Sequence, residues 1–306
     1  MRWRNRRRSQ NVEDRRGMRA PSAMGGFGRG GGSMLNLLPM VFKLFGTKGG
    51  ILVVLAIGAY ALFSGNLGQM LGGGSSEQLT ERSSVPVKQS AAEQELVDFV
   101  SVVLADTEET WHGIFRQLGG KYVEPNLVLF RGAVKSACGF GQAAMGPFYC
   151  PGDQKVYIDL SFYNDLKNRF KAPGDFAQAY VIAHEVGHHV QTLLGISEKV
   201  QKAKRGLSEV DGNQLSVRQE LQADCLAGIW AHHADRSRQL LESGDIEEGL
   251  TAASAIGDDR LQKQSQGYVS PDSFTHGSSA QRVKWFKVGL REGDLKACDT
   301  FTAKRL

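Results

Sequence analysis

Cysteine is scarce in this chain of 306 residues, and its four copies lack the spacing of a metal-binding or redox motif. No two of them form a C-x-x-C pair, which argues against a zinc or redox site of that kind. An even number of cysteines fits disulfides in an oxidising compartment. The short stretch between Cys138 and Cys150 favours a bridge between them, which leaves Cys225 to pair with Cys298. The alternative is four buried thiols in a cytoplasmic domain.

Charge is absent from residues 49–76. The centre of this stretch, residues 51–63, is apolar throughout, and residues 49–71 have about the 20 residues of low polarity that a helix needs to cross hydrocarbon. We therefore expect a single transmembrane helix over residues 49–71. A buried core helix is one alternative, because the strictly apolar run is short. A cleaved signal peptide is another, because the sequence AYA at 59–61 resembles a cleavage site.

Positive charge is concentrated in residues 1–48, which carry eleven basic and two acidic side chains among many glycines and serines. The rest of the chain has a net charge of −4. We expect residues 1–48 to be a basic, largely disordered tail. An arginine cluster can attract nucleic acid. Beside a membrane span, however, it predicts a cytoplasmic tail and a single-pass protein of the inner membrane whose following domain is extracytoplasmic or periplasmic, with no nucleic-acid partner.

The remaining chain divides into a linker over residues 72–90, rich in glycine, serine and charge, and a folded domain over residues 91–306. Apolar residues at spacings of three and four between 96 and 118 predict a long amphipathic helix. Short strands are expected near 127–130, 147–150 and 155–160, and helices after them. This order predicts an α+β domain, mostly helical with a small β-sheet.

Capping patterns predict where the later helices begin. One helix is expected to start at Asp175 and to close at Gly195, and a second to run from about residue 217 to 233. A third is expected at Asp245 with Glu248 in a capping box, and a fourth at Ser278 with Gln281 in the same role.

The sequence HEVGH at residues 184–188 lies inside the helix expected after Asp175. Because four residues make about one helical turn, His184 and His188 leave the same face and can bind one ion. Glu185 lies on the adjacent face, where it can act on the hydrolytic water without binding the metal. An amphipathic helix with two exposed histidines is the alternative, and the apolar residues before the motif argue against it.

A catalytic zinc needs a third protein ligand and one open position. Glu220 is the candidate, in the sequence ELQAD at 220–224. Asp224 lies one turn later and can accept the outer N–H of a ligand histidine. A solvated acidic face is the alternative for these two residues.

An H-E-x-x-H helix followed by an E-x-x-A-D helix resembles the gluzincin metallopeptidases. With residues 138–159 and the sequence FTHGSSAQR at 274–282, the chain is similar to the putative neutral zinc metallopeptidase family of bacterial membrane-anchored proteins over nearly its whole length. The resemblance implies a zincin-like fold and peptidase chemistry on His184, Glu185, His188 and Glu220. Leu194 stands where metzincins have their third histidine, which excludes that pattern.

The other histidines are sorted by position. His276 lies in a loop rich in serine, threonine and glycine before the last helix, where it can stabilise the oxyanion of the tetrahedral intermediate or have only a structural role. His189 is expected to be structural or at the surface, and His112, His232 and His233 to be ordinary surface or helix-end residues.

These features predict a membrane-anchored metallopeptidase that uses Zn²⁺ and Glu185 as general base on a peptide or protein substrate. The substrate is expected to lie along an edge strand at residues 156–160. One rival is a catalytically silent zinc-binding scaffold or chaperone-like module tethered to the bilayer. The other is a nucleic-acid binder that acts through its arginine tail.

Overall fold

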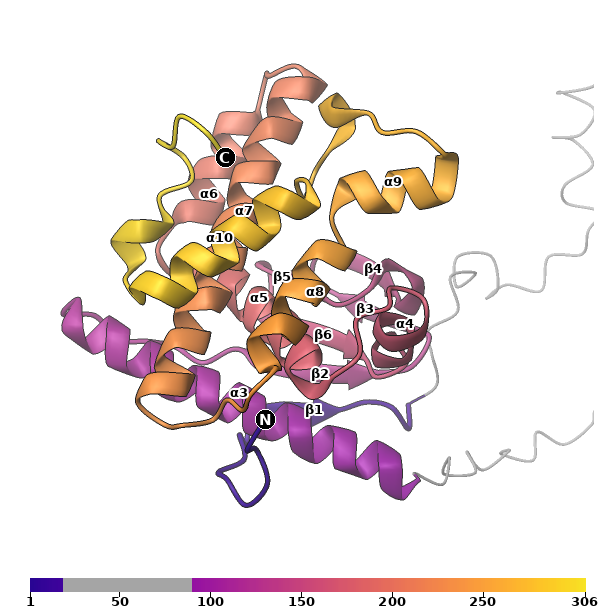
Figure 1. The fold of residues 1–306 in the computed structure, drawn as a ribbon, viewed down its shortest axis with the longest axis vertical. Coiled ribbons are helices and arrows are strands. Elements are labelled where there is room, and N and C mark those ends of the chain that lie inside the picture. Colours follow the sequence, from indigo (N-terminus) through magenta and orange to yellow (C-terminus); the bar gives the residue numbers. More distant parts are fainter. Residues whose placement is uncertain (19–89) are drawn as a thin grey trace, which may run out of the picture. The chain divides into compact units, whose positions relative to one another are not determined.

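A computed structural model describes residues 1–18 and 90–306 (Figure 1). The helices are α3 (Ala91–Gln117), α4 (Phe162–Asn168), α5 (Asp175–Leu193), α6 (Ile196–Lys204), α7 (Glu209–Arg236), α8 (Asp245–Ala255), α9 (Asp258–Gln266) and α10 (Ser279–Glu292). The strands are β1 (Val12–Asp14), β2 (Asn126–Phe130), β3 (Ala133–Ser136), β4 (Gly139–Gln142), β5 (Phe148–Cys150) and β6 (Lys155–Asp159). The prediction of a mostly helical α+β domain with a small sheet is confirmed.

Four strands form the main sheet in the order β1-β2-β6-β5. Strands β1, β2 and β6 are parallel, and β5 is antiparallel to β6. The strand predicted at residues 155–160 is present as β6, but the expectation that it is an edge strand is wrong: β6 is central, and Val156, Tyr157 and Ile158 are all buried. Both faces of β6 are covered because Val156 and Ile158 pack in the helical core, whereas Tyr157 points to the other face and packs with Val134 and Phe148. The edge strand on this side is β5.

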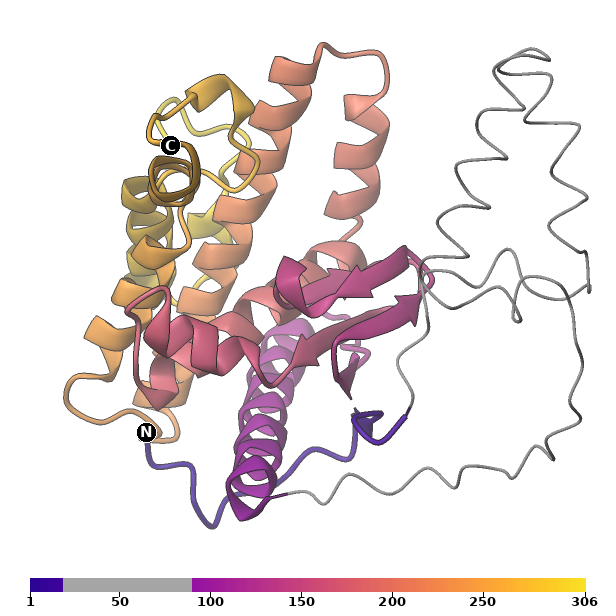
Figure 2. The same ribbon diagram turned by 90° about the vertical axis from the view of Figure 1, so that its right-hand side faces the viewer.

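The first 18 residues are an ordered part of the domain, which differs from the expected tail of residues 1–48. Strand β1 pairs with β2, and Trp3 is buried against Phe99 of α3, with ring centroids 5.4 Å apart. Figures 1 and 2 show this indigo segment running beside α3. A three-residue strand with two acidic side chains gives no local signal, so its pairing depends on the preformed edge of β2.

Three arginines of this segment, Arg4, Arg7 and Arg8, pair with acidic residues of α3. Arg7 donates to the buried Glu108 at 3.0 Å, and Asn11 donates to the same carboxylate at 2.9 Å. Arg8 donates to Asp98 at 2.8 Å. Much of the basic charge near the chain start thus has partners within the domain.

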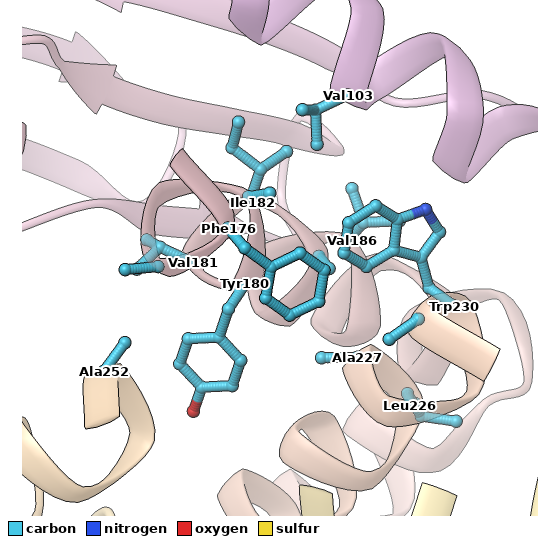
Figure 3. Packing of buried hydrophobic residues seen from close by; sticks show 14 of the residues in the cluster. Val103, Phe176, Tyr180, Val181, Ile182, Val186, Leu226, Ala227, Trp230 and Ala252 are labelled. Carbon is cyan, nitrogen blue, oxygen red and sulfur yellow. The ribbon is translucent and has the colours of Figure 1, made fainter. Parts of the chain in front are cut away.

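The core is centred on α5, whose apolar side chains point in several directions (Figure 3). Phe176 stacks on Trp230 of α7 with a centroid separation of 5.7 Å and an interplanar angle of 12°. Val103 of α3 and Ala252 of α8 border the same cluster. A helix buried on most sides is held in a fixed position by packing, which suits an element that carries a reactive site.

The helix starts predicted from capping patterns are partly right. Ser278 and Gln281 form the expected capping box at α10, and Gly195 ends α5 with a φ of 72°. Helix α7 begins at Glu209, eight residues before the predicted start. Helix α8 does start at Asp245, but Glu248 does not close a capping box there. Instead it accepts the N–H of Phe176 at 3.0 Å and caps α5, a role that Asp175 was expected to play.

Glycines let α10 lie directly on α7. A Cβ at Gly289 would lie 1.9 Å from the carbonyl oxygen of Cys225, and one at Gly228 would lie 2.2 Å from the carbonyl oxygen of Phe286. Any side chain at these positions would separate the two helices. Helices α6 and α7 form an antiparallel hairpin that stands upright in Figure 2.

Both predicted disulfides are present, joining Cys138 to Cys150 and Cys225 to Cys298. Among residues 1–18 and 90–306, no helix combines the length and apolarity needed to span a bilayer. The transmembrane helix expected at residues 49–71 and nearly all of the expected linker at 72–90 lie outside the described residues.

Candidate metal centre

Two histidines of α5 lie one turn apart and face the same helix, α7. The ring centroids of His184 and His188 are 4.8 Å apart, with the rings perpendicular. Nε2 of His184 lies 3.1 Å from one carboxylate oxygen of Glu220, and Nε2 of His188 lies 3.4 Å from the other. All three ligand atoms lie within 4.8 Å of one another. The structure therefore brings together the three residues predicted as metal ligands.

Close packing of α5 on α7 produces this arrangement. A Cβ on Gly187 would lie 3.0 Å from the carbonyl oxygen of Ala223 and 3.2 Å from its Cα. Glycine at this position lets the two helix backbones meet beside the histidines. The glycine of HEVGH and the alanine of ELQAD are thus the contact that aligns the two motifs.

The outer nitrogen of His184 is held by Asp224, as predicted. Nδ1 lies 2.8 Å from the Asp224 carboxylate, which is fully buried. Arg282 of α10 donates to both oxygens of that carboxylate at 2.9 Å, and the Tyr180 hydroxyl donates to it as well. A carboxylate with these donors stays anionic and fixes the tautomer and orientation of the imidazole.

Arg282 and Tyr180 were not predicted from the sequence. Arg282 stands in the sequence FTHGSSAQR, and its side chain is only 3% exposed. A buried guanidinium requires an anionic partner. That partner is 58 residues away in the chain, so the sequence gives no local sign of it.

The outer nitrogen of His188 is held by an amide instead of a carboxylate. Nδ1 lies 2.9 Å from Oε1 of Gln191, which is itself buried. Since both outer nitrogens have acceptors, both Nε2 atoms can give their lone pairs to an ion that Glu220 also binds. Two imidazole nitrogens and one carboxylate form the His₂Glu donor set of catalytic zinc sites, so the residues present fit a zinc ion.

Charge in the site is strongly coupled. Burial alone would lower the pKa of His184, but the Asp224 charge and hydrogen bonds to Asp224 and Glu220 raise it to about 10. Burial alone would raise the pKa of Glu220, yet the two histidines hold it well below its usual range. The pKa of Asp224 is lowered to about 2, against desolvation, chiefly by Arg282 and His184. The anionic carboxylates that attract protons here also attract a divalent cation.

A cleft of about 630 Å³ opens beside these residues. Glu185 lines it together with His184, His188 and Glu220, and so does Tyr149 of the edge strand β5. The Glu185 side chain is 8% exposed and reaches the cleft from the same helix as the histidines. This is the position that a general base acting on a bound water requires.

His276 also lines the cleft, as predicted, and is placed there by Asp258. One Asp258 oxygen accepts the backbone N–H groups of Thr275, His276 and Gly277 at 2.8, 2.6 and 3.0 Å. The other lies 3.3 Å from Nδ1 of His276. This hydrogen bond, together with the nearby charge of Glu220, raises the pKa of His276 against desolvation. Asp258 was not predicted, because nothing in the local sequence links it to a loop 17 residues later.

The remaining histidines have structural partners. His189 is buried, with Nε2 donating to the carbonyl of Val123 at 2.6 Å and Nδ1 accepting from the Tyr149 hydroxyl at 3.0 Å. Burial lowers the pKa of His189, in keeping with a neutral ring. His112 is partly exposed beside Glu124, and His232 and His233 contact carbonyl groups near the end of α10.

A second set of possible metal ligands within the described residues consists of three carboxylates, Asp175, Asp245 and Glu248. The α-amino group of Met1 lies 3.0 Å from Asp175 and 3.3 Å from Asp245. This group contains no histidine and lies apart from the residues that line the cleft. The His184 group is therefore the better candidate for a catalytic metal.

Comparison with known proteins places these residues in a family context. The family model described as putative neutral zinc metallopeptidase matches residues 1–301. The chain is 50% identical over 302 residues to the uncharacterized protein YpfJ of Escherichia coli strain K12, which covers 98% of this chain and 99% of that protein. It is 42% identical over 218 residues to the uncharacterized protein Rv2575 of Mycobacterium tuberculosis strain H37Rv, covering 68% and 73% of the two chains. No solved structure matches the chain.

Proposed function

Since the chain belongs to the putative neutral zinc metallopeptidase family, we propose that it hydrolyses peptide bonds with Zn²⁺ held by His184, His188 and Glu220. The single observation that carries the proposal is the convergence of three ligand atoms within 4.8 Å, beside a cleft that Glu185 also lines. The sheet, with α5 beside its edge strand, supports a zincin-like fold.

The chemistry divides between the ion and the protein. Zinc in such a site supplies a Lewis acid that polarises a carbonyl and lowers the pKa of water toward neutrality. Glu185 accepts the proton of the attacking water and delivers it to the departing amine. His276, kept protonated to higher pH by Asp258, donates a hydrogen bond to the oxygen that gains negative charge. Arg282 and Asp224 hold His184 in place throughout.

The substrate backbone is proposed to pair with β5. This strand is last in the sheet order, and Phe148 and Tyr149 of β5 both line the cleft. An extended peptide added to that edge would lie in the cleft that His184 and Glu185 line. Strand β6, the site predicted from the sequence, is already paired on both sides.

Replacement of Glu185 by Gln tests the proposal. The variant should bind zinc like the wild type and lose about 10²- to 10⁴-fold or more in peptide hydrolysis, because the base is lost and the ligands are kept. Glu198→Gln, an exposed carboxylate paired with Lys202, is the matched control and should keep full activity. Mass spectrometry of products from a peptide library would report activity and cleavage preference together. Equal cleavage by the Glu185 variant and the wild type would overturn the role of the base.

The same assay separates the enzyme from the zinc-binding scaffold. A scaffold would bind zinc and produce no cleavage with or without a chelator. The peptidase should lose its activity when the chelator is added and regain it with zinc.

We further propose that residues 1–18 and residues 90–306 face one compartment, with residues 49–71 providing contact with the bilayer. A cytoplasmic start and an extracytoplasmic domain, as the positive-inside rule predicts, would separate β1 from β2 and Arg7 from Glu108. The two disulfides favour an oxidising, extracytoplasmic compartment for both parts. Cysteines introduced singly at Arg8 and at Lys202 should react alike with an impermeant maleimide in intact cells. Labelling of only one of the two sites would contradict the proposal.

A further inference from the structure

A continuous chain of buried hydrogen bonds leads from the metal centre to a disulfide. Nδ1 of His188 contacts Oε1 of Gln191 at 2.9 Å, and Nε2 of Gln191 donates to Oε1 of Gln222 at 3.0 Å. Nε2 of Gln222 then donates to the backbone carbonyl of Cys298 at 3.0 Å. Gln191 and Cys298 have no exposed surface, and Gln222 is 8% exposed.

The carbonyl of Cys298, at the end of this series of hydrogen bonds, decides which group is donor and which is acceptor in each of them. A backbone carbonyl can only accept, so Gln222 must turn its amide nitrogen toward Cys298 and its oxygen toward Gln191. Gln191 must then present its nitrogen to Gln222, and it also donates to the carbonyl of Gln219 at 2.7 Å. Only its oxygen is left for the histidine.

It follows that His188 must donate from Nδ1. With the proton kept on Nδ1, the lone pair of Nε2 is the one that a metal ion shared with Glu220 would use. Asp224 imposes the same tautomer on His184 through a carboxylate. For His188 the tautomer comes from two glutamines and two backbone carbonyls.

The carbonyl at the end of the chain belongs to a disulfide cysteine. Cys298 is bonded to Cys225, which is buried in α7 one residue after Asp224. The residues beyond Cys298 have a second attachment, because Arg218 donates to the carbonyl of Thr300, whose hydroxyl donates to the carbonyl of Arg218 at 2.6 Å. Loss of the disulfide would remove the covalent bond that fixes Cys298 and its carbonyl, while the hydrogen bonds between Thr300 and Arg218 would keep the C-terminal segment attached.

We infer that the Cys225–Cys298 disulfide tunes metal affinity, with Gln191 and Gln222 as positioning residues that transmit its state to His188. The inference rests on the metal centre of the proposed function but not on peptide hydrolysis. Oxidised protein has a rigid acceptor at the end of the chain and a fixed His188 tautomer. In the reduced protein the Cys298 carbonyl is mobile, and the protein binds the ion more weakly.

Zinc affinity of the full-length protein, measured by competition with a chromophoric chelator, tests this without any substrate. Gln222→Met keeps the side-chain length and removes both hydrogen bonds, and it should raise the zinc Kd by about 10- to 100-fold. The double variant Cys225→Ala with Cys298→Ala should raise the zinc Kd by about 10-fold. Reduction of the Cys225–Cys298 disulfide in the wild type should have the same effect. Circular dichroism would establish that each variant is folded.

Two controls match these changes. Gln219→Met removes a glutamine side chain from the same helix and leaves the backbone carbonyl that Gln191 uses. Cys138→Ala with Cys150→Ala removes the other disulfide, which is not part of the chain. Both should keep the zinc Kd within about twofold of the wild type.

A spectroscopic measurement reports the tautomer directly. In zinc-loaded protein with ¹⁵N-labelled histidine, long-range ¹H–¹⁵N spectra should show His188 protonated at Nδ1, and Gln222→Met should weaken that signature. Wild-type zinc affinity in the folded cysteine double variant would overturn the inference and leave the proposed function intact. Tight zinc binding that depends on the disulfide, without peptide cleavage, would overturn the proposed function and leave this inference intact.

Discussion

The backbone of α5 at Gly187 touches the backbone of α7 at Ala223. A methyl group at Gly187 would lie 3.0 Å from the Ala223 carbonyl oxygen, closer than side chains normally approach. This contact sets the distance between the histidines on one helix and Glu220 on the other. The metal centre therefore depends on a residue that has no side chain.

Gly187→Ala should separate the two helices by a few tenths of an ångström and weaken zinc binding. Overpacking of this kind costs about 1–3 kcal/mol and offsets the gain of up to about 1 kcal/mol from replacing a helical glycine. Gly113→Ala in α3 is the control, because a Cβ there has nothing within 4 Å. It should stabilise the protein slightly and leave zinc affinity unchanged. A Gly187 variant with normal zinc affinity would show that the contact is not limiting.

Arg282→Met should destabilise the protein strongly and weaken the metal site. Arg282 and Asp224 form a buried ion pair, and removal of one partner leaves an uncompensated charge at a cost of about 3–5 kcal/mol. Arg291→Met removes an exposed arginine from the same helix and should cost under about 1 kcal/mol. Urea unfolding would measure both values. A similar loss of unfolding free energy in the two variants would argue against the importance of the buried ion pair.

Asp258→Asn should shift the alkaline limb of the pH profile of kcat/KM to lower pH. The hydrogen bond that His276 donates to Asp258 raises the pKa of His276, so the protonated ring persists to higher pH than the usual pKa of about 6.5 allows. Activity that needs this proton is present below the pKa and is lost as the pH rises through it. Asp272→Asn, in the exposed turn before the same loop, should leave the limb in place. An unchanged limb in the Asp258 variant would exclude His276 as the group that titrates.

Trp3→Ala should destabilise the whole domain, because residues 1–18 are part of its core. Trp3 is 8% exposed and packs on Phe99, and truncation of a buried tryptophan costs about 3–5 kcal/mol. Met18→Ala is the control, since Met18 is 66% exposed. Thermal unfolding would compare the two. A separate disordered tail would make both substitutions neutral.

Local patterns in the sequence were enough to predict most elements of the fold and the three candidate metal ligands that the structure brings together. The apolar spacing between residues 96 and 118 predicted α3, and the capping box at Ser278 predicted the start of α10. Spacing of one helical turn placed His184 and His188 on one face. The pairing of the four cysteines also followed from their separations, because one pair lies across a short turn.

Local patterns failed where a residue acts on a distant part of the chain. Glu248 was expected to cap its own helix but caps α5, 72 residues earlier. The arginines near the chain start were interpreted by charge alone, although several have acidic partners about 90 to 100 residues later in α3. The partners of a charged side chain follow from packing, which composition does not encode.

By itself the sequence determined which residues are candidate metal ligands, which residue is the proposed general base, and the helices that carry them, because these depend on spacings of three and four along one chain. Only the tertiary structure decided how the ligands are held. Arg282, Gln191, Gln222 and Asp258 come from different elements and act through hydrogen bonds that exist only when α5, α7, α9 and α10 are packed together. A buried polar group must find its partner in space, so its role cannot be derived before the fold is known.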